Sequence, residues 1–160
     1  SDISAWAVSA MQWAVGQGLI QGSNGQLRPQ IVTFLWRAAG SPEPKNVGSF
    51  SDVPASAYYA KAVAWAVENG ITTGTGDGMF SPDAVCTRAQ AVTFLWRYEK
   101  APVASRGNPF ADVAADSYYA DAVLWAVKED ISKGTTNTAF SPDADCTRAQ
   151  IVTFLWRCKK

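Results

Sequence analysis

The stretch Cys-Thr-Arg-Ala-Gln-Ala-Val-Thr-Phe-Leu-Trp-Arg at residues 86–97 returns at residues 146–157 with one change, and a shorter form, Gln-Ile-Val-Thr-Phe-Leu-Trp-Arg, stands at residues 30–37. The Phe of this stretch recurs every 60 residues, at Phe34, Phe94 and Phe154. A fixed period is typical of tandem repeats, in which one unit cannot bury its apolar face alone and its neighbours complete the core. The sequence therefore predicts that function resides between the repeats.

The first copy of the unit is shorter than the other two. Its helical Trp13 lies only 52 residues before Trp65, eight fewer than the period of 60. Alignment places most of this shortfall between Pro29 and Gln30, so that the first copy lacks the Thr-Arg-Ala of the motif. We interpret the gap as a loop that is missing from the sequence as written. A true deletion here is less favoured, because it would remove the start of a helix and leave the rest of that helix in place. Three repeats that form one folded unit are then expected at residues 1–40, 50–100 and 110–160.

Composition narrows the class of protein. With 160 residues, 48% of them hydrophobic, the chain is long enough for one core of ordinary size. Lys and Arg together number 14, as do Asp and Glu, so the charge gives no reason to expect binding to nucleic acid or an anionic membrane. No apolar stretch approaches the ~20 residues of a membrane span, and no signal peptide is recognisable. We expect a mature or excised fragment.

Each repeat is predicted to be two helices joined by a turn-rich loop. In the second copy, apolar residues recur with helical spacing over residues 58–68, and Asn69-Gly70 ends that helix. Thr87-Arg88-Ala89-Gln90 then fits a capping box, so a second helix is expected from Arg88 to about Glu99. That helix is apolar around most of its circumference and should therefore be central. The expected fold is all-α, with three helix–loop–helix repeats in a pseudo-threefold bundle and the first helices outside.

The residues available for chemistry argue against an enzyme or a metal site. The chain has no His, and its three cysteines, Cys86, Cys146 and Cys158, do not have zinc-site spacing. No Glu recurs across the copies, and a Cys nucleophile would lack a base. We expect no catalytic residue, metal or cofactor. Cys86 and Cys146 are interpreted as small buried residues that precede a helix, with a disulfide or a reactive thiol as the alternative.

Five short motifs follow one another in the second copy, and most return in the third. They are Phe-Ser-Asp-Val (50–53; Phe-Ala-Asp-Val at 110–113), a helical Trp (65 and 125), Gly-Ile-x-x-Gly (70–74), Phe-Ser-Pro-Asp (80–83 and 140–143) and Thr-Arg-Ala-Gln (87–90 and 147–150). In this order they resemble the S-layer homology domain, over nearly the whole chain and in three tandem copies.

The resemblance implies both a shape and a partner. Three such repeats form a three-pronged pseudo-trimer, which anchors surface proteins non-covalently to the secondary cell-wall polysaccharide of Gram-positive bacteria. That polysaccharide is linked to peptidoglycan and is often pyruvylated, and it binds in grooves between neighbouring repeats. The chain would then be one module of a larger surface protein, located outside the cell in the wall or S-layer. The competing hypothesis is a helical-repeat scaffold that binds a protein or peptide.

Arginine at a helix start suits a ligand of this kind. A ketal pyruvate presents a planar carboxylate, which a guanidinium group can bind through two parallel hydrogen bonds. Arg88 and Arg148 follow a capping Thr, where free N–H groups and the helix dipole add positive potential. We therefore expect both to bind the ligand. The alternative is a salt bridge to a nearby acid such as Asp83 or Asp143.

The sequence departs from the family pattern in each copy. Gln90 and Gln150 stand where Glu is commonest; both remain candidates for ligand binding, although a carboxylate is lost there. In the third copy Asp130 replaces Gly70, and Thr replaces two further Gly residues, so its loop is expected to be stiffer. The motif Arg is also missing from the first copy as aligned, and a true deletion there would leave one groove without its charge.

Six further residues are candidates for the ligand site, and each also has a structural explanation. An Asp can accept from sugar hydroxyls or tie down a loop, and a Gly can admit a ligand or serve a turn. A Trp can stack on a sugar or fill the core, and its Ala and Val neighbours favour the core. The adjacent Tyr residues at 58–59 and 118–119 are better candidates for an exposed aromatic rim. The six are Asp52, Asp112, Gly74, Gly134, Trp65 and Trp125.

Overall fold

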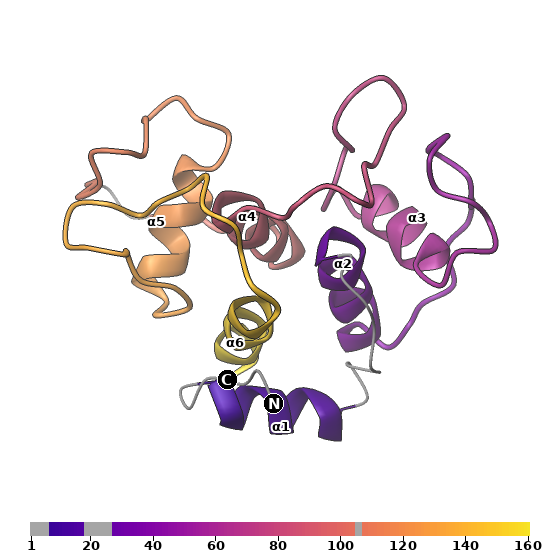
Figure 1. Cartoon of the computed structure of the whole chain (residues 1–160), viewed down its shortest axis with the longest axis horizontal. Coiled ribbons are helices and arrows are strands. Elements are labelled where there is room, and N and C mark those ends of the chain that lie inside the picture. The colour runs from indigo at the N-terminus through magenta and orange to yellow at the C-terminus, as the bar shows by residue number, and fades with distance from the viewer. Residues whose placement is uncertain (1–6, 18–26, 105–106) are drawn as a thin grey trace.

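Helices and the loops between them make up the described part of the chain, which is residues 7–17, 27–104 and 107–160 of a computed structural model. The helices are α1 (Val8–Gly16), α2 (Leu27–Ala38), α3 (Ala60–Glu68), α4 (Arg88–Tyr98), α5 (Ala120–Lys128) and α6 (Arg148–Lys159) (Figure 1). No β-strand occurs within these ranges, so the predicted all-α fold is confirmed. None of the helices in them has both the length and the hydropathy needed to cross a lipid bilayer.

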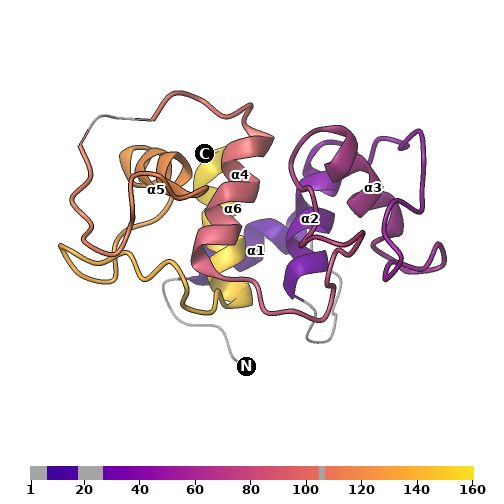
Figure 2. The same ribbon diagram turned by 90° about the horizontal axis from the view of Figure 1, so that it is seen from above.

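The second helix of each repeat lies at the centre of the molecule, and the first helix lies outside, as predicted. α2, α4 and α6 contact one another, and Figure 1 shows three prongs arranged around them. Each outer helix packs on the central helix of the preceding repeat: α3 on α2, α5 on α4 and, closing the ring, α1 on α6. Figure 2 shows the same arrangement from above. Because every prong draws on two repeats, no repeat is complete without its neighbours.

Capping boxes start α4 and α6, as the sequence predicts. The hydroxyl of Thr87 accepts a hydrogen bond from the Gln90 amide at 3.2 Å, and Gln90 Oε1 accepts one from the Thr87 amide at 3.0 Å. Thr147 and Gln150 repeat the exchange at 3.2 and 2.9 Å. A cap of this kind stabilises a helix by about 1 kcal/mol. Since a neutral amide oxygen is sufficient here, Gln in place of Glu leaves the helix start intact.

Aromatic side chains from the loops complete the core between the helices. Phe80 and Phe140 precede α4 and α6, and both are fully buried, as their position after the turn-rich loops predicts. Phe50 and Phe110 pack on them, with ring centroids 5.8 and 5.6 Å apart respectively. Each long loop is therefore fixed at one end by an aromatic pair.

The first repeat keeps its motif Arg, contrary to the expectation from alignment. α2 begins at Leu27 and carries Arg28 60 residues before Arg88. The two side chains make equivalent contacts: Arg28 Nη1 donates to the Phe80 carbonyl at 3.5 Å, and Arg88 Nε donates to the Phe140 carbonyl at 3.1 Å. Arg28 is therefore the counterpart of Arg88, and the predicted absence of this Arg is wrong.

Matching Arg28 to Arg88 also changes where the eight residues are missing from the first repeat. The missing residues precede Leu27 rather than separating Pro29 from Gln30, and the sequence runs without a break from Ser1 to Lys160. The shortfall therefore lies in the chain itself, and the interpretation as an omitted loop is wrong. The helix persists because Pro29 falls in its first turn, where a backbone N–H has no partner inside the helix.

Candidate functional site

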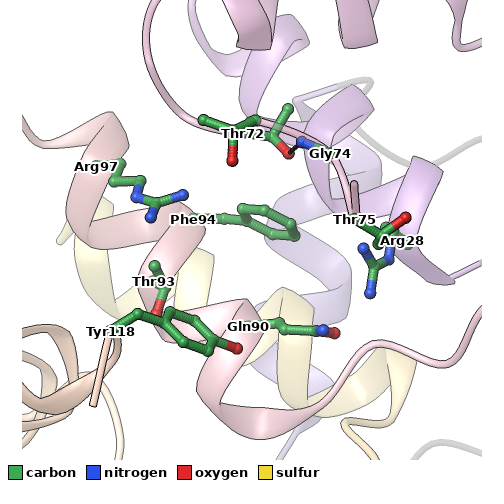
Figure 3. A pocket seen from close by; sticks show the side chains of 10 residues that line it. Arg28, Thr72, Gly74, Thr75, Gln90, Thr93, Phe94, Arg97 and Tyr118 are labelled. Carbon is green, nitrogen blue, oxygen red and sulfur yellow. Dashed lines mark hydrogen bonds between the residues drawn. The ribbon is translucent and has the colours of Figure 1, made fainter. Parts of the chain in front are cut away.

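A pocket of about 410 Å³ opens between two prongs, and all three repeats contribute to its wall (Figure 3). We call it the Arg28 pocket. One side is the start of α2 and the other is the face of α4 that carries Gln90, Phe94 and Arg97, while the loop after α3 and Tyr118 complete it. It is lined by Arg28, Thr72, Thr73, Gly74, Thr75, Gln90, Thr93, Phe94, Arg97 and Tyr118.

The Arg28 pocket is positively charged, since its lining contains two arginines and no carboxylate. Arg28 is only 5% exposed, and its Nε has no hydrogen-bond partner among the described residues. Its Nη1 makes only the long bond to the Phe80 carbonyl. Arg97 is half-buried and donates to the Ile71 carbonyl at 3.2 Å. A buried guanidinium without an acidic partner is costly, so this pocket favours an anionic ligand.

Tyr118 supplies a flat aromatic face beside this charge. The side chain is 58% exposed and stands across the pocket from the loop after α3 (Figure 3). An edge-to-face contact with Tyr119, at a centroid distance of 5.0 Å, supports its ring. The pKa of Tyr118 is raised, first by burial and then by Tyr119 and Asp143, while the nearby Arg28 and Arg97 oppose the rise.

A counterpart of this arrangement lies between two other prongs. Tyr58 stands 60 residues before Tyr118 and is also exposed. Burial and Tyr59 raise the pKa of Tyr58, while Arg37 and Arg148 lower it. Tyr58, Arg37 and Arg148 thus correspond to Tyr118, Arg97 and Arg28 of the Arg28 pocket. Only Tyr58 and Tyr118 form the predicted aromatic rim, since Tyr59 is buried and Tyr119 is partly buried.

The side chain of Arg88, a ligand-binding candidate from the sequence, is engaged by hydrogen bonds and a ring contact within the protein. It is 6% exposed, and it donates from Nε to Phe140 at 3.1 Å and from Nη2 to Lys133 at 2.8 Å, both backbone carbonyls. Its guanidinium lies over the Phe140 ring, 4.7 Å from the centroid. Burial lowers the pKa of Arg88. Its described partners are carbonyls rather than the predicted Asp, and they come from the third repeat.

Arg148 is half-buried at the start of α6 and lowers the pKa of Tyr58. Gln90 lines the Arg28 pocket while its Oε1 caps α4, and Gln150 caps α6. Arg88 and Arg148 therefore lie in different surroundings, and neither lines the Arg28 pocket. Of the sequence candidates, the structure places only Gln90 and Gly74 in the Arg28 pocket.

Asp52 and Asp112 tie loops together in the way that the structural interpretation predicts. The two oxygens of Asp52 accept from the backbone amides of Phe80 and Ser81 at 2.8 and 2.7 Å. Asp112 makes the same two bonds in the third repeat, to Phe140 at 2.9 Å and Ser141 at 2.8 Å. Each carboxylate therefore joins the entry of a repeat to the end of its long loop.

Asp112 should also make stability depend on pH. The bond from the Phe140 amide, followed by the one from Ser141, lowers the pKa of Asp112 from its usual 3.8. The charged form is thus preferred in the folded state. Its contribution is complete above about pH 4 and is lost as the pH falls through the lowered pKa. We expect Asp112→Asn to lower the Tm by a few degrees at pH 7 and to lose less stability than the wild type at acidic pH.

Thermal unfolding followed by circular dichroism between pH 2 and pH 7 measures this effect. Asp116→Asn is the matched control, because Asp116 is an exposed carboxylate of the same loop. An Asp112→Asn curve parallel to the wild type across the whole range would show that the carboxylate does not supply the acid dependence.

Gly74 and Gly134 are required by packing. A Cβ on Gly74 would lie 2.4 Å from the Met79 carbonyl oxygen and 2.5 Å from the Phe50 ring. At Gly134 the corresponding distances are 2.4 Å to the Thr136 carbonyl oxygen and 2.6 Å to the Phe110 ring. No side chain fits either place. Gly74 also lines the Arg28 pocket, so the same residue shapes the wall of the groove.

Trp65 and Trp125 are buried in the prongs, at 6% and 5% exposure. The Trp65 ring packs 6.2 Å from Tyr98 on the neighbouring central helix. Rings covered in this way favour the core interpretation over stacking on a sugar. Tyr118 offers the exposed face that they lack.

The sequence analysis missed Arg28 and Arg97, and it named Tyr118 only as part of an exposed aromatic rim. Each left a signal. Arg97 ends the repeated stretch and recurs at Arg37 and Arg157, and Arg28 stands one period before Arg88. Tyr118 was recognised as exposed, but nothing in the sequence placed it beside two arginines from other repeats.

Comparison with known proteins agrees with this architecture. The sequence profile of the S-layer homology domain matches residues 1–30, 49–92 and 109–152. The chain is 36% identical over 113 residues to a cell surface protein of Thermoanaerobacter kivui, covering 68% of the chain and 15% of that protein. It is 32% identical over 116 residues to an S-layer protein of Bacillus thuringiensis subsp. finitimus, covering 72% of the chain and 14% of that protein.

A more distant relative is named as an enzyme rather than as a surface protein. An amylopullulanase of Thermoanaerobacterium thermosulfurigenes is 23% identical over 164 residues, a match that covers 94% of the chain but 9% of that protein. The match thus concerns a small part of a large protein. The chain spans at most 15% of the length of these three relatives.

Proposed function

This chain belongs to the S-layer homology domain family, and from that premise we propose that it binds an acidic, pyruvylated secondary cell-wall polysaccharide in the Arg28 pocket. It is a cell-surface anchoring module located at the wall or S-layer of a Gram-positive bacterium. Because the relatives that it matches are much longer, we propose that it anchors a longer surface protein of which it is one module.

The observation that carries the proposal is the buried guanidinium of Arg28, whose Nε has no hydrogen-bond partner and which has no acidic partner among the described residues. A carboxylate fixed on a sugar ring would supply the missing negative charge and accept hydrogen bonds from this guanidinium. Arg28 lies in the first turn of α2, where the helix dipole adds to the attraction. Arg97 contributes a second positive charge on the opposite wall. The pocket is therefore suited to an anion rather than to an apolar peptide.

The remaining lining fits the sugar that carries the carboxylate. The exposed face of Tyr118 can cover the apolar face of a pyranose ring. Thr73, Thr75 and the amide of Gln90 offer polar groups to its hydroxyls. Gly74 keeps the loop after α3 free of a side chain at the edge of the groove.

A second groove would strengthen attachment without any new chemistry. The arrangement of Tyr58, Arg37 and Arg148 repeats that of the Arg28 pocket between two other prongs. Since a polysaccharide repeats its own unit, one chain or two neighbouring chains can occupy both grooves. Simultaneous binding of this kind raises the overall affinity above that of either site.

Calorimetry with purified wall polysaccharide tests the proposal. We expect binding that weakens about 100-fold when mild acid removes the pyruvate ketals, because a buried charged contact is worth roughly 2 to 5 kcal/mol. A polysaccharide that is re-purified after mock treatment is the control. Equal affinity before and after removal of pyruvate, or no binding to either form, would contradict the proposal.

A further inference from the structure

Two of the three cysteines face each other across the junction of the second and third repeats. The loops that lead into α4 and α6 form a short antiparallel pairing, in which Thr87 bridges Asp145. The Arg88 amide donates to the Ala144 carbonyl at 2.9 Å. On the other side of the bridge, the Cys146 amide donates to the Cys86 carbonyl at 2.8 Å. Cys86 and Cys146 are therefore directly opposite residues.

Both cysteines are free thiols in this structure, and the backbone pairing gives them a separation that suits a disulfide. Opposed residues of an antiparallel pair have Cα atoms about 4.5 to 5.5 Å apart. A disulfide spans Cα separations of about 4.4 to 6.8 Å. Both side chains have 0% exposure, so they share the inward face of the pairing. The pKa of Cys146 is raised to about 12, first by burial and then by its neighbour Cys86.

We propose that Cys86 and Cys146 are joined by a disulfide in the protein at the cell surface, which links the second repeat to the third. The family places the module outside the cell, where disulfides persist. The formation of this disulfide does not depend on polysaccharide binding. The loop that it closes contains about sixty residues, which makes a large stabilisation possible.

The third cysteine cannot compete for this bond. Cys158 lies near the end of α6, and Cys146 precedes the start of the same helix. At 1.5 Å per residue the two are separated by about 18 Å. The Sγ of Cys158 instead points to Glu99 Oε1, at 3.5 Å. The first repeat has Gln26 one period before Cys86, so the repeat pattern supplies a pair of cysteines here rather than three.

The bond has to form while the chain folds. In the folded protein, burial raises the pKa of Cys86 to about 12, which leaves almost no thiolate at neutral pH. In the open chain, one thiolate attacks a low-molecular-weight disulfide and releases one thiol. The second cysteine, after losing its proton, attacks the mixed disulfide and releases the other thiol. Two electrons pass to the external disulfide, and the two protons go to the released thiols.

Refolding with glutathione tests the proposal. The unfolded chain is refolded in a mixture of oxidised and reduced glutathione, or in dithiothreitol, and is then denatured in acid and alkylated with N-ethylmaleimide. After oxidative refolding we expect one maleimide per chain, on Cys158, and a Cys86–Cys146 cross-linked peptide. After refolding in dithiothreitol we expect three. The oxidised form should unfold at a Tm roughly 10 °C higher.

Single substitutions provide the matched controls. In Cys146→Ala the Tm should no longer respond to the redox buffer, whereas in Cys158→Ala the response should persist. Mass analysis of the wild type needs no variant and decides the question even if a substituted chain folds poorly. Three maleimides after oxidative refolding, a disulfide that includes Cys158, or a Tm that is the same in both buffers would overturn the proposal.

Discussion

Replacing Arg28 with Gln is expected to weaken binding to pyruvylated wall polysaccharide by at least about 30-fold while the fold remains intact. The expectation follows from how little the protein itself uses this side chain. Among the described residues, Arg28 makes one hydrogen bond, of 3.5 Å, and its Nε has no partner. Removing a buried charge that lacks an acidic partner relieves a desolvation cost. We therefore expect the free energy of unfolding to change by less than about 1 kcal/mol.

Calorimetry measures the affinity, and chemical denaturation measures the stability. Lys128→Gln makes the same change of charge on an exposed side chain and controls for the loss of net positive charge. Arg28→Lys keeps the charge but loses the planar fork, so its affinity should fall between those of the wild type and Arg28→Gln. Unchanged affinity in Arg28→Gln would show that the ligand binds elsewhere. Lost affinity with an equal loss of stability would make Arg28 a structural residue.

The same substitution at the equivalent place in the second repeat should have the opposite effect. Arg88→Gln is expected to lower the free energy of unfolding by about 3 kcal/mol, with a fall in Tm of about 10 °C. Arg88 donates to two carbonyls of the third repeat and covers the Phe140 ring, so its loss leaves buried acceptors without donors. A donor of the length and shape of Arg is needed to reach both.

Thermal and denaturant unfolding of Arg88→Gln beside Arg28→Gln forms a matched pair, because the change is identical and the helix position is the same. Polysaccharide affinity, measured well below the Tm, should remain within about threefold of the wild type for Arg88→Gln if its guanidinium is occupied by the protein. A stable Arg88→Gln that no longer binds would instead assign ligand contact to Arg88, as the motif alone predicts.

Local rules made the architecture predictable. The period of 60 residues, the capping Thr and the nearly all-apolar second helix each depend on short segments, and the structure confirms what they predict. The packing of each outer helix on the central helix of the preceding repeat could not be predicted in this way. It depends on which central helix lies nearest in space, and the repeat pattern is equally compatible with either partner.

The candidate site was less predictable because its walls come from different repeats. Arg88 has the expected position in the motif, yet the carbonyls that hold it are 45 and 52 residues away along the chain. Arg28 was overlooked because the alignment matched its Pro to the Pro of the Phe-Ser-Pro-Asp motif. Helix register, rather than identity of residues, places Arg28 opposite Arg97 and Tyr118.

The packing of α1 on α6 determines the order in which the prongs of an emerging chain can close. A chain that is exported with its N-terminus first releases α1 long before the helix on which it packs. That prong can close only when the last dozen residues have emerged, whereas the prong made by α2 and α3 can close much earlier. The prong made by α1 and α6 is therefore the last part of the module that can close.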